Sequence, residues 1–235
     1  MRFCLGNLKS RKSGSDKNLA GGLMSWGDIP DWAYESVGAL LQSLNAVEPS
    51  TYHHCLRVGE YCRKLAKETG LNEYEQKVAE FSGLLHDIGK IGIDKDILLK
   101  PSRLDPKEAD IMKSHSVISE QIIKPLTAHP FFKMILPAVR GHHERVDGEG
   151  YPDKLAGEAI PLISRIILVV DTYDAMAENR IYRKGLPDDV IYSEIKRCKG
   201  TQFDPQIAKV FLDAHPQWKI TSDHETYNNI IKRVA

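Results

Sequence analysis

The segment FSGLLHDIGKIG, residues 81–92, is the most informative stretch of this sequence. Its first half has the apolar composition of a buried helix, yet the segment continues into His86, Asp87 and Lys90. Ionisable groups at buried positions cost several kcal/mol unless they are paired or bind a metal ion. The segment therefore predicts a helix that delivers an imidazole, a carboxylate and an ammonium group to a site for metal ions and a phosphate.

The sequence around this segment also predicts helices. Apolar residues recur with a 3.6-residue period in a lead helix from about 30 to 46 and in a second helix from about 52 to 69, with a break at 48–51. Capping signals begin a third helix at Asn72 and another at Asp105, and we expect the latter to carry His115. Further helices are expected over 130–144 with a kink at Pro137, from Pro161 onward, and over about 188–199 and 205–214. The predicted fold class is all-α.

Composition excludes several classes of protein. The chain has 235 residues, 42% hydrophobic residues and a formal net charge of +0, which gives no general attraction for a nucleic acid polymer. No run is long enough for a transmembrane span, and the N-terminus lacks the apolar core of a secretory signal. The four cysteines form no CxxC pair, so a reducing cytoplasm is the expected compartment.

Three regions are expected along the chain. Residues 1–27 are predicted to be a flexible basic tail, because residues 1–24 hold five basic residues and one Asp. Residues 28–217 form the predicted domain, and residues 218–235 a C-terminal tail. Within the domain, the irregular segment 144–161 is long enough to predict a functional loop.

Histidines and aspartates recur beside predicted core positions throughout the middle of the chain. The candidates are His54, His86, Asp87, His115, His142, His143 and Asp171. Any one of them alone is explained as a satisfied core residue or a helix cap, but the set as a whole is not. Imidazoles and carboxylates without thiolates are typical of a catalytic metal site. A carboxylate that bridges two cations about 3.5–4 Å apart would allow them to clamp a phosphoryl group and activate a water.

An ordered series of motifs resembles one known family. The motifs are HCLRV (54–58), HDIGKIGI (86–93), MKSHS (112–116), HHERVDGEGYP (142–152), VVDTYDAM (169–176), NRIYRK (179–184) and GTQFDP (200–205). They resemble the HD-GYP subgroup of the HD phosphohydrolase superfamily over residues 48–214. The resemblance implies one HD helical bundle, with an HD core and GYP loop over 52–180 and a C-terminal helical extension over 188–214. It also implies a metal-dependent phosphodiesterase that hydrolyses the bacterial second messenger cyclic di-GMP to 5′-pGpG, with GMP as the product of a second cleavage.

The resemblance also assigns roles to residues. His54, His86, Asp87 and Asp171 match the ligands of a first metal, and Asp87 would bridge to a second that His115 and His142 also hold. His143 would be a further ligand or lie just behind the site. Lys90 matches a residue that reaches the scissile phosphate, and Arg180 and Arg183 match residues that bind the substrate's phosphates. Tyr151 would contact the guanine or ribose of the ligand, or hold the loop in place.

The resemblance implies iron or manganese as the metal. Some family members hold a third cation through a glutamate four residues before the first histidine, where this chain has Ser50. We therefore expect two divalent cations. A second copy of the chain, or a signalling protein such as a diguanylate cyclase, is a candidate partner.

Several alternatives stay open on the sequence alone. The substrate could be another cyclic dinucleotide or a nucleotide phosphate, and the domain could be a non-catalytic or weakly active cyclic-dinucleotide-binding module. A mixed imidazole and carboxylate diiron site could also activate oxygen. Lys90 alone could be a cation at a helix C-terminus. Asp174 and Glu178, which follow Asp171 by one and two turns, could lie behind the ligands or on the surface.

Overall fold

The computed structural model describes residues 29–178 and 184–218. The helices in these ranges are α1 (Asp31–Val47), α2 (Pro49–Glu68), α3 (Glu73–Leu85), α4 (Lys95–Leu98), α5 (Pro106–Lys113), α6 (His115–Ile123), α7 (Pro130–Arg140), α8 (Leu162–Ala177), α9 (Asp188–Arg197) and α10 (Pro205–Ala214). Short 3₁₀ helices are η2 (Ile88–Gly92), η3 (Lys124–Ala128), η4 (Gly157–Ala159) and η5 (His215–Gln217). The described part of the chain contains no β-strand, which confirms the predicted all-α class.

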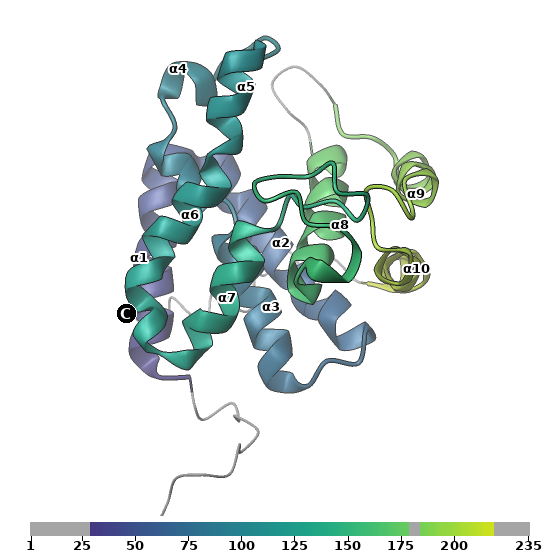
Figure 1. Ribbon diagram of the computed structural model, residues 1–235, viewed down its shortest axis with the longest axis horizontal. Coiled ribbons are helices and arrows are strands. Elements are labelled where there is room, and N and C mark those ends of the chain that lie inside the picture. Colours follow the sequence, from purple (N-terminus) through teal and green to yellow (C-terminus); the bar gives the residue numbers. More distant parts are fainter. Residues whose placement is uncertain (1–28, 179–183, 219–235) are drawn as a thin grey trace, which may run out of the picture.

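Two hydrophobic clusters hold the helices together. The first joins α1, α3, α7 and the N-terminal part of α2, with Leu44, Phe81 and Phe131 fully buried. The second joins the C-terminal part of α2 to α8, α9 and α10, and its buried residues include Phe211. In Figure 1, α9 and α10 lie beside each other on the far side of α8 from α7. Helix α2 contributes to both clusters, and His54 lies on it about one turn before Val58, the first α2 residue of the second cluster.

Helices α2 and α3 cross at two glycines. A side-chain carbon placed on Gly83 would come 2.9 Å from the Cα atom of Gly59 and 3.0 Å from the Val58 carbonyl oxygen, so Gly83 has no room for a larger residue without a shift of the helices. His54 lies before one glycine and His86 after the other. The close crossing therefore brings these two imidazoles to within 5.2 Å between ring centroids.

The helix limits differ from the predicted ones at four places. Helix α2 begins at Pro49, because proline suits the first helical position and the Glu48 side chain caps Ser50 and Thr51. Helix α5 ends at Lys113, so His115 begins the separate helix α6 and is not on the helix that Asp105 opens. Helices α7 and α9 end at Arg140 and Arg197, earlier than predicted.

Other local predictions are confirmed. Asn72 and Asp105 form capping boxes with Glu75 and Glu108, and α8 follows Pro161 directly. Helix α7 continues through Pro137, and the kink expected there stays a prediction. The domain limits 28–217 also stay a prediction. The tail 1–27 and most of 218–235 lie outside the described residues.

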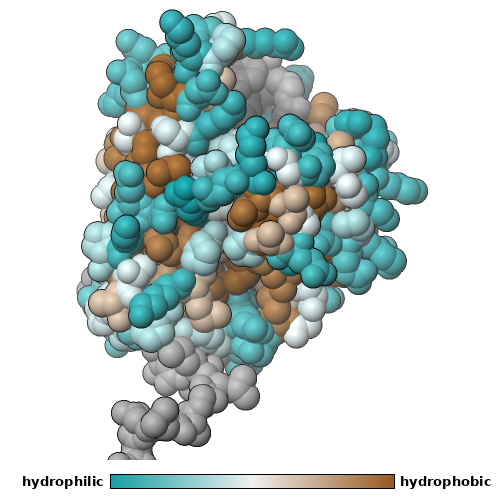
Figure 2. All heavy atoms as spheres, in the orientation of Figure 1, coloured by the Kyte–Doolittle hydropathy of each residue, from teal (hydrophilic) through white to brown (hydrophobic). Residues whose placement is uncertain are grey.

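The hydropathy of the surface differs from one part of the helical bundle to another. Figure 2 shows hydrophilic side chains over α9 and α10 and a hydrophobic patch over the α4–α5 hairpin. Leu99 and Ile111 of this hairpin are 50% and 46% exposed. Within the described ranges, no helix combines the length and apolar character needed to span a bilayer.

Candidate metal centre

The metal-ligand candidates come from five parts of the fold. His54 lies on α2, His86 and Asp87 directly follow α3, and His115 begins α6. His142 and His143 lie in the turn after α7, and Asp171 lies on α8. In the described structure, all of these side chains lie together in two adjoining groups.

The first group contains His54, His86 and Asp87, whose ligand atoms lie within 4.8 Å of one another. Asp171 adjoins it, with its Oδ1 atom 3.1 Å from His54 Nε2 and 3.9 Å from His86 Nε2. His86 is 0% exposed, and Asp87 is 2% exposed. These are two imidazoles and two carboxylates around one point in the protein interior.

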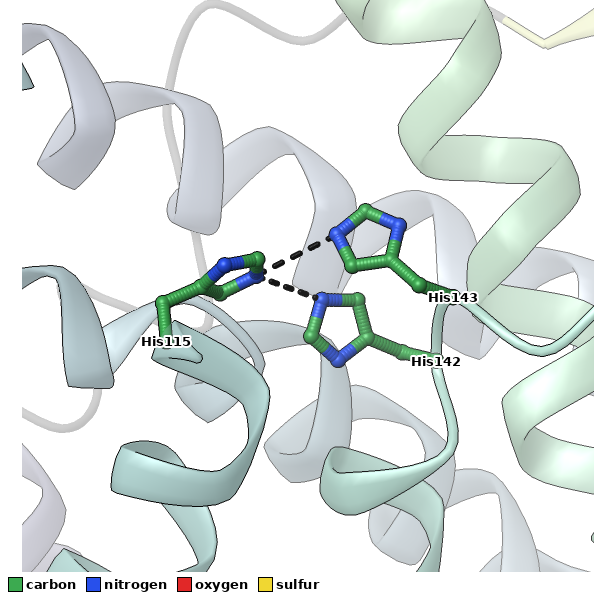
Figure 3. Close-up of side chains that lie close together, drawn as sticks. All are labelled: His115, His142 and His143. Atoms are coloured by element: carbon green, nitrogen blue, oxygen red, sulfur yellow. Dashed lines mark hydrogen bonds between the residues drawn. The ribbon is translucent and has the colours of Figure 1, made fainter. Parts of the chain in front are cut away.

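The second group contains His115, His142 and His143, which Figure 3 shows converging from α6 and from the turn after α7. The Nε2 atom of His115 lies 3.2 Å from the Nε2 atoms of both His142 and His143. Their ligand atoms also lie within 4.8 Å of one another. Three imidazole nitrogens therefore share a space that one cation would fill.

The hydrogen bonds at Nδ1, the ring nitrogen that points away from the ligand groups, determine the tautomer of three of these histidines. Nδ1 of His86, His115 and His142 each faces a backbone carbonyl, of Gly83, Met112 and Val139 respectively, at 2.6–2.7 Å. A carbonyl only accepts, so each Nδ1 carries the hydrogen and donates it. In a neutral imidazole the Nε2 atom then carries a lone pair, and this tautomer can bind a metal ion through Nε2.

Burial favours the neutral rings. It lowers the pKa of His86, of His115 and, most strongly, of His142, and it lowers the pKa of His143 to about 3. Lone pairs on His115 and His142 consequently face each other at 3.2 Å, and the buried His86 Nε2 has no hydrogen-bond partner among the described residues. Lone pairs that point at one another repel, and a cation between them removes the repulsion. The donor set fits divalent metal ions.

Asp87 links the two groups. Its Oδ1 atom lies 3.2 Å from His115 Nε2, and its Oδ2 atom lies 3.4 Å from His86 Nε2. Burial acts to raise the pKa of Asp87, but the Lys90 ammonium and the charged His54 ring hold it well below its usual range. The carboxylate is thus ionised, with one oxygen directed at each group.

His54 differs from the other histidines. Burial acts to lower its pKa, but its hydrogen bonds to Asp171 and Asp174 outweigh that effect and raise the pKa to about 9. Asp171 stays ionised, because its bond to His54 lowers its pKa despite burial. Without a cation, His54 is an imidazolium held between two carboxylates, so its Nε2 proton has to leave before that nitrogen can bind a metal.

Lys90 and Tyr151 border the site. The Lys90 Nζ atom lies 2.5 Å from Asp87 Oδ2, and this charge pairing raises the pKa of Lys90 despite burial. The Tyr151 ring stacks on His143, with the centroids 4.7 Å apart and the planes 27° from parallel. Arg180 and Arg183 lie outside the described residues, so their predicted contacts with phosphate stay predictions.

Sequence reasoning missed three residues that support the site. Glu144 is fully buried and accepts the backbone N–H groups of Asp153 and Leu155, which ties the GYP loop to the histidine pair. Ser119 on α6 accepts from Gly89 N–H and donates to His86 C=O. Arg57, one turn beyond His54, pairs with Asp174. Of these three residues, only Arg57 could have been found from the sequence, because it lies three residues after His54 and so shares its helix face.

Glu48 does not join the ligand set. Both of its carboxylate oxygens accept backbone N–H groups at the start of α2, from Ser50 and Thr51. It therefore acts as a helix cap.

Comparisons with known proteins agree with this geometry. A family model described as "HD domain" matches residues 38–207. A cyclic di-GMP phosphodiesterase of Thermotoga maritima is 33% identical over 206 residues, which is 86% of this chain and 56% of that protein. A 3′3′-cGAMP-specific phosphodiesterase of Vibrio cholerae is 33% identical over 186 residues, which is 79% of this chain and 35% of that protein.

A solved structure supports the fold. The crystal structure of a cyclic GMP-AMP specific phosphodiesterase from V. cholerae matches with a TM-score of 0.56 and 19% identity, over 84% of this chain and 53% of that chain. This chain spans about half of the T. maritima relative and about a third of the V. cholerae one. The family model covers most of the chain. The histidines and aspartates of this chain's motifs lie together in one buried region. The chain belongs to the HD domain family, as its resemblance to the HD-GYP subgroup predicts.

Proposed function

We propose that this chain is a metal-dependent phosphodiesterase that hydrolyses cyclic di-GMP to 5′-pGpG, and in a second cleavage to GMP. Its relatives named for cyclic di-GMP and for 3′3′-cGAMP support a cyclic dinucleotide as the substrate class. The observation that carries the proposal is the pair of adjoining ligand groups, with the Asp87 carboxylate directed at both.

Two divalent cations would occupy this centre. His54, His86 and Asp171 would hold one, His115, His142 and His143 the other, and Asp87 would bridge them. Iron and manganese are the candidates, since both accept imidazole and carboxylate ligands. When bound, such cations lower the pKa of water and offset the charge of a phosphate.

The remaining side chains would bind and orient the substrate. The Lys90 ammonium, which pairs with Asp87, would contact a phosphate oxygen and stabilise the charge that develops during cleavage. The Tyr151 ring forms a wall next to His143 against which a base or ribose could lie. Arg180 and Arg183 would bind the phosphates. The leaving group is the ribose 3′ oxygen.

The proposal also covers the compartment, the domain limits and the partners of this chain. We infer a cytoplasmic protein whose domain spans 28–217 between two tails. A second copy of the chain or a diguanylate cyclase is the proposed partner.

One experiment tests the function. The protein is prepared without oxygen, its metal content is measured, and it is incubated with cyclic di-GMP and, separately, with 3′3′-cGAMP. We expect two metal ions per chain and the release of pGpG or GMP. Faster cleavage of 3′3′-cGAMP would correct the substrate while leaving the enzyme class in place. Metal and dinucleotide binding without cleavage would favour a binding module instead.

A further inference from the structure

Asp174 is a buried carboxylate outside the predicted ligand set. It lies on α8 one helical turn after Asp171 and is 2% exposed. Its Oδ1 atom accepts from Arg57 Nε at 2.7 Å, and its Oδ2 atom accepts from Arg57 Nη2 at 2.9 Å. Its Oδ2 atom also lies 2.7 Å from His54 Nδ1. Both oxygens are thus occupied by protein groups, which places Asp174 behind His54 and not among the ligands.

The contact with His54 determines the orientation of that ring. An ionised carboxylate only accepts, so His54 Nδ1 must carry a hydrogen and donate it to Asp174. The opposite nitrogen, Nε2, is then directed into the site, 3.1 Å from Asp171 Oδ1 and 3.7 Å from Asp87 Oδ2. His86, His115 and His142 obtain the same orientation from backbone carbonyls. Among the histidines whose Nδ1 partner is described, His54 is the one held by a carboxylate.

Arg57 holds Asp174 in place. It lies on α2, the same helix as His54, and its planar guanidinium makes two bonds to the carboxylate, so the three residues tie α2 to α8. Its Nη1 atom lies 3.0 Å from Glu178 Oε1, at the end of α8. The geometry leaves the carboxylate little freedom to rotate away from His54.

We propose that Asp174, clamped by Arg57, is a positioning residue that fixes the His54 ring with Nε2 towards the metal. The inference rests on the proposed function, because it assumes that His54 binds a cation. A carboxylate bonded to a metal-binding histidine fixes its tautomer and makes the ring a stronger ligand. Loss of such a partner usually costs about 10–100-fold in metal affinity or activity.

Metal affinity tests the proposal without substrate. The metal-free protein is titrated with Mn²⁺ in competition with a fluorescent chelator, as wild type, Asp174→Asn and Arg57→Lys. Asp174→Asn should weaken one of the two binding steps by about 10–100-fold. Arg57→Lys, which keeps the charge but loses the two-point clamp, should give a smaller loss. Asp213→Asn is the control, since Asp213 pairs with Lys209 on the exposed face of α10.

A spectroscopic readout separates positioning from general loss of structure. With Zn²⁺ as a diamagnetic probe, ¹⁵N imidazole spectra should show His54 with hydrogen on Nδ1 in the wild type and a mixture of tautomers in Asp174→Asn. Equal Mn²⁺ affinity and an unchanged His54 tautomer in a folded Asp174→Asn protein would overturn the positioning role alone. Failure of the wild type to bind Mn²⁺ would overturn the proposed function and this inference with it.

Discussion

Asp87 Oδ1 lies 3.2 Å from His115 Nε2, a contact that joins the turn after α3 to the first residue of α6. The other oxygen of Asp87 faces His86 and Lys90, so one carboxylate takes part in both ligand groups. Isolated histidines in a helical core do not explain such an arrangement, whereas a pair of cations would explain it, because a shared anion lowers their mutual repulsion.

Replacement of Asp87 therefore tests the two-cation centre. Asp87→Asn keeps the shape of the side chain but removes the charge that both cations would share. We expect the metal content, measured by elemental analysis after gel filtration, to fall from two ions per chain to fewer than one. Asp110→Asn is the matched control, because Asp110 is exposed and pairs with Lys113. A variant that kept both ions would contradict the bridging role of Asp87.

A second prediction concerns the contact between η2 and α6. A side-chain carbon on Gly89 would lie 2.0 Å from His115 O and 2.5 Å from Ser119 N, which are backbone atoms. Gly89→Ala should therefore push α6 away from the Asp87 turn, with a loss of metal binding and a lower midpoint of urea unfolding. Gly92→Ala, on the same 3₁₀ helix, would meet only the Ile118 side chain, at 3.1 Å. We expect it to be tolerated far better, and equal effects of the two substitutions would refute this explanation.

A third prediction follows from the neutral histidines. The pKa values of His86, His115, His142 and His143 are lowered in the fold, chiefly by burial. An unfolded histidine has a pKa of about 6.5, so below that pH the unfolded chain binds protons that the folded chain does not. The free energy of unfolding of the metal-free protein should therefore fall as the pH drops from about 6.5 to about 5.

His54 adds an effect of opposite sign. Its pKa is raised to about 9, so its stabilising contribution is complete below about pH 6.5 and is lost as the pH rises through about 9. Metal-free stability should thus be greatest near pH 6.5. Urea unfolding of chelator-treated protein at about pH 5, 6.5 and 9.5 checks this, with His53→Asn on the exposed face of α2 as a control for the loss of a histidine. If the free energy of unfolding did not change between about pH 6.5 and about pH 5, the histidines would not be held neutral in the fold.

Part of the candidate ligand set could be found from the sequence for a physical reason. His86 and Asp87 follow an apolar helix, and a charged pair at the end of a buried segment is a local pattern that is visible in one stretch of chain. The helices were visible through their 3.6-residue period, and the capping boxes at Asn72 and Asp105 through a spacing of three residues.

Two of the residues that support the site, Ser119 and Glu144, could not be found in this way. Ser119 bonds Gly89 and His86 from 30 and 33 residues away, and Glu144 binds a loop that folds back on it. Such contacts depend on how distant segments pack, which leaves no periodic signal in the chain. The predicted break after the lead helix was too long for a related reason, since the Glu48 side chain caps α2 from just outside it.

A last prediction concerns Glu144 and the GYP loop. The two carboxylate oxygens accept the N–H groups of Asp153 at 2.6 Å and Leu155 at 3.0 Å, and the loop from Glu144 to Asp153 carries the Tyr151 ring that stacks on His143. Glu144→Gln replaces one acceptor with an NH₂ group, so two donors would face each other in the protein interior. The expected cost is about 1–3 kcal/mol of stability.

The loop should open locally in this variant before the helices unfold, because η4 and the GYP segment pack less apolar surface than the bundle. Hydrogen exchange at the amides of Asp153 and Leu155 should accelerate, while exchange within α2 and α3 changes little. KM for the dinucleotide should rise more than kcat falls, since the Tyr151 wall is displaced but the ligand groups are kept. Glu149→Gln, at an exposed position of the same loop, is the control and should alter neither quantity. Unchanged amide exchange in Glu144→Gln would mean that contacts other than this carboxylate hold the loop closed.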